Sequence, residues 1–451
     1  MENSLAAGRR LLKGVWELAH SALVGRQLPM LITYLGASMS LVAGSVMQLI
    51  SMAILARAMG VAQFGLYLSM MALSTFALEL IGLGSIEALL RRVARDKSIY
   101  PVALGHSLIL AALTAMVICP ALLILLPFWV HNLSGTDLDT LAIAVFAIGN
   151  TLILHLVLLT EKIFIAQGQF FRANLVNLSL AASRLCAAAL ACLVFSVTSL
   201  SSWIEWQVAS YIVVLIGCVF AVRGLGMPQW VIMREELSKG FYYCVSSAVM
   251  TLKQGIDVII LGLVAGPAVV GAFGLARRII DTSSLMLVAF FRVVYPMLAR
   301  AMENGISSGL NLAFKVLTAV VGIAVCTVIG LYIVAPLCPL VFGPQFEVAV
   351  PYLYQLAWIL IAYAISSTAA DALGASGQHG VRAVAYCFTT IGIVVVGLLT
   401  YFYSTTGTII GIYITEFAMA AGFWAAVLYL VRREARAASQ SPAQSEPLPP
   451  Q

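Results

Sequence analysis

Long apolar runs separated by short polar stretches dominate the pattern of hydrophobic positions along the chain. A helix needs about 20 apolar residues to cross about 30 Å of hydrocarbon, and the sequence contains twelve runs of this kind. Each run is expected to be helical, because backbone groups without hydrogen bonds are costly in lipid. The predicted spans are 31–56, 63–84, 104–129, 140–161, 173–195, 203–222, 242–265, 268–290, 313–338, 350–372, 383–403 and 406–431. The pattern therefore predicts an all-α integral membrane protein.

The polar stretches divide the chain into two halves of six spans each. A first lobe is predicted at 30–223 and a second at 240–432, joined by a basic linker at 224–239. Residues 1–29 carry apolar positions at helical spacing with arginines and lysines between them. This is typical of an amphipathic helix on a membrane surface, and a disordered leader is the alternative. The tail at 433–451 contains much serine, proline and glutamine and is predicted to be disordered.

Composition and charge agree with this pattern. Of the 451 residues, 62% are hydrophobic and 10% are charged, whereas soluble domains carry about 25% charged residues. With the N-terminus in the cytoplasm, nineteen of the 25 lysines and arginines lie in segments on that side and one, Arg57, on the other. The positive-inside rule therefore predicts that both termini are cytoplasmic. Because the basic residues are spread over many short loops, no nucleic-acid partner is expected.

Two pairs of similar segments indicate that the halves are copies of each other. ARAMGVAQFGLY at 56–67 aligns with GLVAGPAVVGAF at 262–273, and AQGQFFR at 166–172 aligns with ASGQHGVR at 375–382. The matched residues are Gly60 with Gly266, Gly65 with Gly271, and Gly168-Gln169 with Gly377-Gln378. Since each half has an even number of spans, both halves enter the membrane from the same side. The pseudo-axis then runs along the membrane normal, with a central cavity between two pseudo-symmetric lobes.

Charged residues inside the predicted spans are the candidate functional residues, because a charge in lipid is costly and usually lines a cavity or pairs with another charge. A cationic patch would suit an anionic head group, since guanidinium groups donate two parallel hydrogen bonds to phosphate and keep their charge. The candidates for this patch are Arg277, Arg278, Lys253 and Arg184, together with Arg292, which follows the eighth predicted span. The candidates for binding a coupling proton or sodium ion are Asp257, Glu79 and Asp281.

A simpler interpretation of these charges remains open. Lys253 and Asp257 are four residues apart, as are Arg277 and Asp281, so each pair can neutralise itself across one helical turn. Such pairs would fasten helices without taking part in transport. Asp371 and Glu416 are two further carboxylates within predicted spans, and an interfacial cap is the simpler role for Asp371.

The chain lacks the motifs of several enzyme classes. It contains no P-loop GxxxxGK[ST], so ATP is not expected to drive it directly, and it contains no HExxH or GxSxG. All eight cysteines lie in apolar runs without a CxxC pair, which indicates neither disulfides nor a metal site. The sequence therefore predicts no enzymatic activity and no cofactor.

One segment resembles a known transporter family. LARAMGVAQFGLYLSMMALSTFALELIGLGSIEALLRRVARD at 55–96 is similar to the opening helices of polysaccharide transporters in the multidrug/oligosaccharidyl-lipid/polysaccharide exporter superfamily. The residues that carry the resemblance are Leu55-Ala56-Arg57, Gly60, Phe64-Gly65-Leu66-Tyr67, Gly82-Leu83-Gly84 and Arg91, then Asp257, Leu261-Gly262, Gly271 and Ala276-Arg277-Arg278. The sequence departs from the family pattern at Glu79, where an aspartate two residues before the glycine cluster is more usual, and at Gly271-Ala272-Phe273, where a Gly-Tyr-type ending is more usual.

The resemblance implies a flippase that moves undecaprenyl-pyrophosphate-linked oligosaccharides across a bacterial inner membrane by alternating access, for surface polysaccharide synthesis. Its partners would be this lipid-linked substrate and membrane lipids, with a polysaccharide polymerase and a chain-length regulator as further candidates. One alternative is a multidrug or cation antiporter of the same superfamily, whose cavity should favour acidic and aromatic residues. Another is a membrane polysaccharide polymerase or ligase, which would typically need a large external loop, whereas the longest here has about nine residues.

Overall fold

The computed structural model describes residues 28–135 and 138–440, and within them it is helical, with no strand. The first half contains α2 (Leu28–Leu80), α3 (Ser85–Arg95), α4 (Tyr100–Ser134), α5 (Thr140–Ile148), α6 (Leu154–Ala166), α7 (Phe170–Ala189) and α8 (Leu200–Val222). The second half contains α9 (Arg234–Ala265), α10 (Pro267–Ser283), α11 (Leu285–Ala301), α12 (Leu310–Val334), α13 (Cys338–Phe342), α14 (Val350–Ala357), α15 (Ile359–Ala375) and α16 (His379–Gln440). The prediction of an all-α fold is confirmed.

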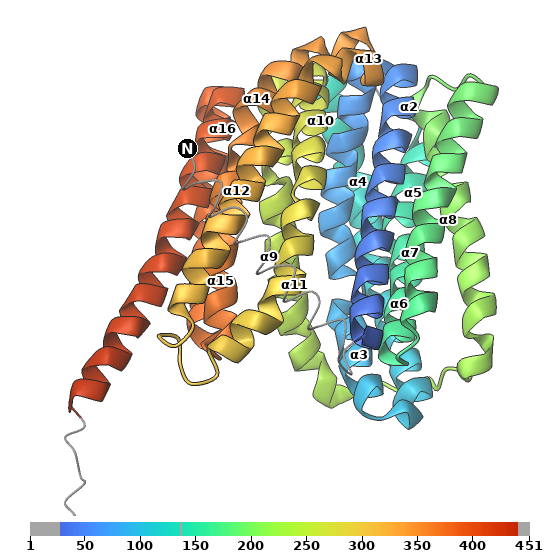
Figure 1. The fold of residues 1–451 in the computed structure, drawn as a ribbon. Helices are drawn as coiled ribbons and strands as arrows, with labels where there is room; N and C mark the ends of the chain where they lie inside the picture. Colours follow the sequence, from blue (N-terminus) through green and yellow to red (C-terminus); the bar gives the residue numbers. More distant parts are fainter. Residues whose placement is uncertain (1–27, 136–137, 441–451) are drawn as a thin grey trace, which may run out of the picture.

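Ten helical stretches of the described residues are long and apolar enough to cross a membrane. Two of them contain a break in helical geometry, α2 at Gly60 and α16 at Ser404. A straight helix of the 53 residues of α2 would be about 80 Å long, far more than one crossing requires. Figure 1 shows the chain reversing direction within α2. The count of twelve spans stays a prediction, because the continuous stretches number ten.

Three helices extend beyond the predicted boundaries. The stretch formed by α10 and α11 runs from Pro267 to Ala301, so it continues past the predicted end at residue 290 and includes Arg292. α9 begins at Arg234, inside the predicted linker, where Glu235 and Glu236 lie in its first turn and interact favourably with the helix dipole.

α16 also continues to Gln440, into the segment predicted as a disordered tail. The reason is a tertiary contact: the Glu434 carboxylate accepts hydrogen bonds from the backbone N–H groups of Ile306 and Ser307, each at 3.0 Å. Residues 441–451, and the predicted surface helix up to residue 27, lie outside the described residues.

The glycines matched in the two halves adopt the same backbone conformations. Gly60 has φ 76° and ψ 169°, and Gly266 has φ 77° and ψ 166°. Gly168 and Gly377 have φ of 76° and 75°, the left-handed region that favours glycine. In each case the following glutamine N–H closes the helix end, on Phe164 O at 2.8 Å in one half and on Leu373 O at 2.9 Å in the other. These shared turns support a duplicated architecture.

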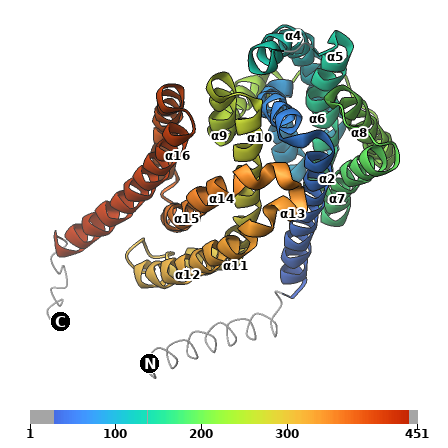
Figure 2. The same cartoon turned by 90° about the horizontal axis from the view of Figure 1, so that it is seen from above.

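The two halves meet closely along α2 and α10. Seen from above, α4 to α8 group on one side and α11, α12, α15 and α16 on the other, with α2, α9 and α10 between them (Figure 2). A Cβ added at Gly65 would lie 1.8 Å from the Pro267 carbonyl oxygen, and one added at Gly271 would lie 2.1 Å from the Val61 carbonyl oxygen. The backbones of α2 and α10 are therefore in contact, which small residues permit between membrane helices.

Replacing Gly65 with alanine tests this contact. The added methyl group has no room against the Pro267 carbonyl, so we expect a loss of about 1–3 kcal/mol in the free energy of unfolding. The melting temperature of the detergent-solubilised protein should fall. Gly217→Ala is the matched control, because a Cβ at exposed Gly217 meets nothing within 4 Å. Equal melting temperatures of the two variants would contradict the close packing.

Candidate functional site

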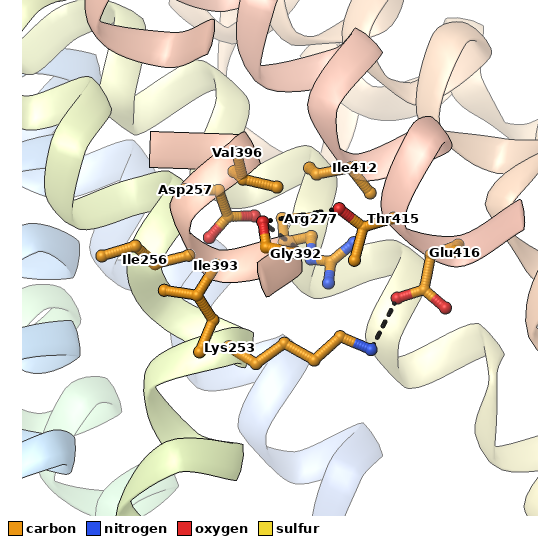
Figure 3. Close-up of a pocket in the computed structure, with 10 residues that line it drawn as sticks. All are labelled: Lys253, Ile256, Asp257, Arg277, Gly392, Ile393, Val396, Ile412, Thr415 and Glu416. Carbon is orange, nitrogen blue, oxygen red and sulfur yellow. Dashed lines mark hydrogen bonds and ion pairs between the residues drawn. The ribbon is translucent and has the colours of Figure 1, made fainter. Parts of the chain in front are cut away.

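A cluster of charged residues lies inside the second half, where α9, α10 and α16 converge. Lys253 and Asp257 come from α9, Arg277 from α10 and Glu416 from α16, and all four line one cavity (Figure 3). The Asp257 side chain is buried and the backbone N–H of Val258 donates to it at 2.8 Å. We call these four residues together with Asp281, which lies one turn along α10 from Arg277, the C-half cluster.

The ion pairs of the C-half cluster differ from those that helical spacing predicts. Lys253 Nζ lies 2.9 Å from Glu416 Oε1 of α16 and is not paired with Asp257. Arg277 Nε lies 3.6 Å from both Asp257 Oδ2 and Asp281 Oδ1, so this arginine bridges α9 and α10. The expected Arg277–Asp281 pair is therefore present, whereas the expected Lys253–Asp257 pair is wrong.

Both cations of the C-half cluster are already paired with carboxylates, so the cluster offers no free positive charge to an anion. It contains two cations, Lys253 and Arg277, and three carboxylates, Asp257, Asp281 and Glu416, which gives one excess negative charge if all are ionised. Buried charges are normally paired in this way, because desolvating an unpaired charge is costly. An incoming phosphate would have to displace a carboxylate from either cation.

A second cavity brings Arg184 of α7 together with Arg278 of α10. The other lining residues all come from the first half, so Arg278 reaches across the boundary between the halves, and we call this the inter-lobe cavity. Its lining consists of Gln48, Ser51, Met52, Leu55, Tyr67, Leu68, Met71, Arg184, Trp203, Gln207 and Arg278. It contains no carboxylate.

Neither arginine of the inter-lobe cavity has an acidic partner. Among the described residues, no ion pair involves Arg184 or Arg278, and Arg184 Nε is buried without a hydrogen-bond acceptor. The guanidinium of Arg184 instead lies 4.8 Å from the centre of the Tyr211 ring, a cation–π contact. Two uncompensated cations facing one cavity are suited to binding an anion.

The remaining predicted residues lie outside both cavities. Glu79 is partly buried in α2, and its backbone carbonyl accepts a hydrogen bond from the Cys244 thiol of α9 at 3.3 Å. Arg292 is exposed on α11, beyond the predicted end of its span. An arginine at such a position can keep its charged end in a polar layer while its stem lies along apolar surface. The structure thus brings together Arg184 and Arg278, separates them from Lys253 and Arg277, and leaves Arg292 apart.

Gln207, Trp203 and Tyr67 were missed by sequence reasoning, although they line the inter-lobe cavity. The available signal was the glutamine within a predicted span, because a carboxamide, like a charge, is costly in lipid without hydrogen bonds. Trp203 and Tyr67 gave no comparable signal, since aromatic residues are common in apolar cores.

Polar contacts tie the two halves together at both ends of the bundle. At the end where α3 meets α9, which we call the basic end, the buried Glu236 carboxylate accepts from Arg91 and, at 2.7 Å, from Arg92 Nε. At the opposite end, where α13 lies (Figure 1), Arg57 of α2 donates to the backbone carbonyls of Leu340 and, at 2.7 Å, Val341. Both contacts join side chains to the other half and can break without unfolding a helix.

Comparison with known proteins places the chain in one family and one fold. The model of the family described as "Polysaccharide biosynthesis protein" matches residues 34–302, well over half of the chain. No curated protein sequence is similar enough to count as a match.

Solved structures of MATE transporters share the fold. An inward-facing multidrug resistance MATE family transporter of the MOP superfamily gives a TM-score of 0.66 at 17% identity, over 94% of this chain and 99% of that one. An outward-facing multidrug resistance MATE family transporter of the MOP superfamily gives a TM-score of 0.59 at 17% identity, over 91% of this chain and 96% of that one. A Vibrio cholerae MATE transporter gives 0.59 at 16% identity, over 92% and 98%. At these identities the likeness concerns the fold alone.

The Lys253–Glu416 pair can be tested by a double-mutant cycle. Removing one partner leaves the other charge buried, so we expect Lys253→Met and Glu416→Gln each to lower the free energy of unfolding, on the order of 3 kcal/mol. The double variant should lose less than the sum of the two. Melting temperatures of the purified variants provide the measurement, and strictly additive losses would show that the two side chains do not interact.

Proposed function

The chain belongs to the polysaccharide biosynthesis protein family, and from this premise we propose that it is a flippase for a lipid-linked oligosaccharide. It is a multi-pass membrane transporter of the MOP superfamily. The proposal adds the substrate, a saccharide joined through a diphosphate to a polyprenyl chain, and the site that holds its head group. The observation that carries it is the pair of unpaired arginines in the inter-lobe cavity.

Energetics favour an anionic ligand at this cavity. An arginine at the centre of a membrane helix costs about 2.5–3.5 kcal/mol, and neither Arg184 nor Arg278 recovers this cost by pairing with a carboxylate of the described residues. A diphosphate can accept two parallel hydrogen bonds from each guanidinium. A cation would instead be repelled, which argues against the antiporter alternative.

Alternating access gives the two ends of the bundle their roles. We assign the basic end to the cytoplasm of a bacterial inner membrane, since positive residues are retained on that side. The head group would enter the inter-lobe cavity when the Glu236 contacts with Arg91 and Arg92 open. It would leave on the far side when the Arg57 contacts open, while the lipid tail stays in the bilayer. A polymerase and a chain-length regulator would then act on the exported saccharide.

Helix α10 is the element that connects substrate and coupling ion in this proposal. Arg277 belongs to the C-half cluster, and the neighbouring Arg278 lines the inter-lobe cavity. A proton taken up by Asp257 would remove a partner of Arg277 and change the forces on α10. A ligand couples to a conformational change only through its differential binding to the two states. Asp281 and Glu79 are further candidates for this proton or for a sodium ion.

Export in living cells tests the role of the two arginines. In a strain that lacks the native gene, we expect Arg184→Ala and Arg278→Ala each to lower surface polysaccharide about tenfold or more, because each loses hydrogen bonds to a charged group. Lipid-linked oligosaccharide should accumulate inside, as measured by mass spectrometry of extracted lipids. Lys315→Ala, which removes an exposed charge on α12, is the control and should export normally.

Two results would contradict this function. Normal surface polysaccharide in cells that contain the folded double variant Arg184→Ala/Arg278→Ala would exclude an essential head-group contact. Normal polysaccharide in the deletion strain itself, with altered sensitivity to cationic drugs, would favour the antiporter.

A further inference from the structure

A buried amide network lies beside the inter-lobe cavity. It is formed by Gln207 and Tyr211 of α8 and by Asn150, which lies in the π-helical turn Gly149–Ile153 between α5 and α6. Asn150 and Gln207 are each 1% exposed, and Tyr211 is fully buried. Single π-helical turns are rare and occur frequently at functional sites.

The direction of the hydrogen bonds in this network follows from the contact between Asn150 and the Phe146 carbonyl. A backbone carbonyl can only accept a hydrogen bond, so the Asn150 atom 3.0 Å from the Phe146 carbonyl is the Nδ2 donor. Asn150 Oδ1 therefore faces α8, where it accepts from Gln207 Nε2 at 3.0 Å and from the Tyr211 hydroxyl at 3.3 Å. Gln207 Nε2 also donates to the Tyr211 oxygen at 2.6 Å. The orientation of the Gln207 carboxamide follows.

This orientation leaves one acceptor unused. Gln207 Oε1 is buried and has no hydrogen-bond donor among the described residues. A buried acceptor without a donor costs about 1–3 kcal/mol, and the carboxamide cannot turn over without bringing Gln207 Oε1 against Asn150 Oδ1, two acceptors that cannot bond to each other. Since Gln207 lines the inter-lobe cavity, a ligand in that cavity can supply the missing donor.

The groups around Gln207 define the chemistry of that ligand. Arg184 and Arg278 present donors to an anion, whereas Gln207 Oε1 requires a donor, such as a hydroxyl group. Trp203 and Tyr67 add flat, largely apolar surfaces to the lining. A saccharide attached to a phosphate carries an anion and hydroxyl groups close together, and a bare phosphate or diphosphate carries only the anion.

We infer that Gln207 is a specificity-determining residue that accepts a hydrogen bond from a hydroxyl of the first sugar, next to the phosphate held by Arg184 and Arg278. The inference rests on the proposed function, because it assumes that the anion in the cavity is joined to a saccharide. Gln207 thereby distinguishes a loaded lipid carrier from the empty diphosphate carrier, and Asn150 and Tyr211 position its carboxamide.

Binding of two probes to the purified full-length protein tests the inference. Farnesyl diphosphate carries the anion alone, and N-acetylglucosaminyl farnesyl diphosphate carries the anion and a sugar. We expect Gln207→Met to weaken binding of the glycosylated probe about three- to tenfold, the effect of one neutral hydrogen bond. Binding of farnesyl diphosphate should not change. Gln355→Met, at an exposed position on α14, is the matched control and should bind both probes as the wild type does.

The outcomes separate this inference from the proposed function. If Arg184→Ala weakens both probes while Gln207→Met leaves their affinity ratio unchanged, the proposed function survives and the role of Gln207 is wrong. If the wild type binds neither probe, both are wrong. Should Gln207→Met fail to fold, the affinity of the wild type is measured for the glycosylated probe and for the same probe with O-methylated sugar hydroxyls, which cannot donate a hydrogen bond. We expect the O-methylated probe to bind at least about threefold more weakly than the unmodified probe. Equal affinities for the two probes would overturn the inference.

Discussion

The pairing of charges inside the membrane is the constraint on which this structure depends. Arg277 and Arg278 are adjacent in α10, and their side chains point into two different cavities. Arg277 meets the carboxylates of Asp257 and Asp281, which compensate its charge. Arg278 reaches the inter-lobe cavity, where no carboxylate lines the wall. The first arginine is therefore neutralised within the second half, and the second is the one for which we propose an anionic ligand.

The boundary between the halves combines a rigid backbone contact with side-chain contacts that can break. Along α2 and α10 the glycines Gly65 and Gly271 bring the backbones into contact, which provides a rigid seam. The ties at the two ends are of another kind, because Glu236 and Arg57 make side-chain contacts that can exchange for water. A seam with breakable ties at either end is suited to rocking about α2 and α10, which alternating access requires.

Much of the fold could be predicted because it follows from local rules. Apolar runs of membrane length gave the helical architecture, and the Gly60 and Gly266 pattern gave a repeat whose backbone angles agree. The boundaries failed where tertiary contacts extend a helix. Glu434 holds α16 against the backbone of residues 306 and 307, and no local sequence pattern predicts this contact.

The candidate site was predicted in part, because helical spacing identifies contacts within one helix but not contacts between helices. Spacing along one helix identifies partners one turn apart, so Arg277–Asp281 was found. The partner of Lys253 is Glu416, which lies in a helix far along the chain and is chosen by packing. Gln207 carries no formal charge, so the pattern of intramembrane charges does not include it. Its importance depends on the orientation of its carboxamide, which Asn150 fixes across two helices.

Translocation by the purified protein in vesicles tests the central claim most directly. A fluorescent lipid-linked oligosaccharide is placed in both leaflets, and a quencher that cannot cross the membrane is added outside. If the chain is a flippase, all of the fluorescence becomes quenchable in vesicles that contain the protein. In protein-free vesicles only the outer-leaflet fraction is quenched. Equal quenching with and without folded protein would contradict the account.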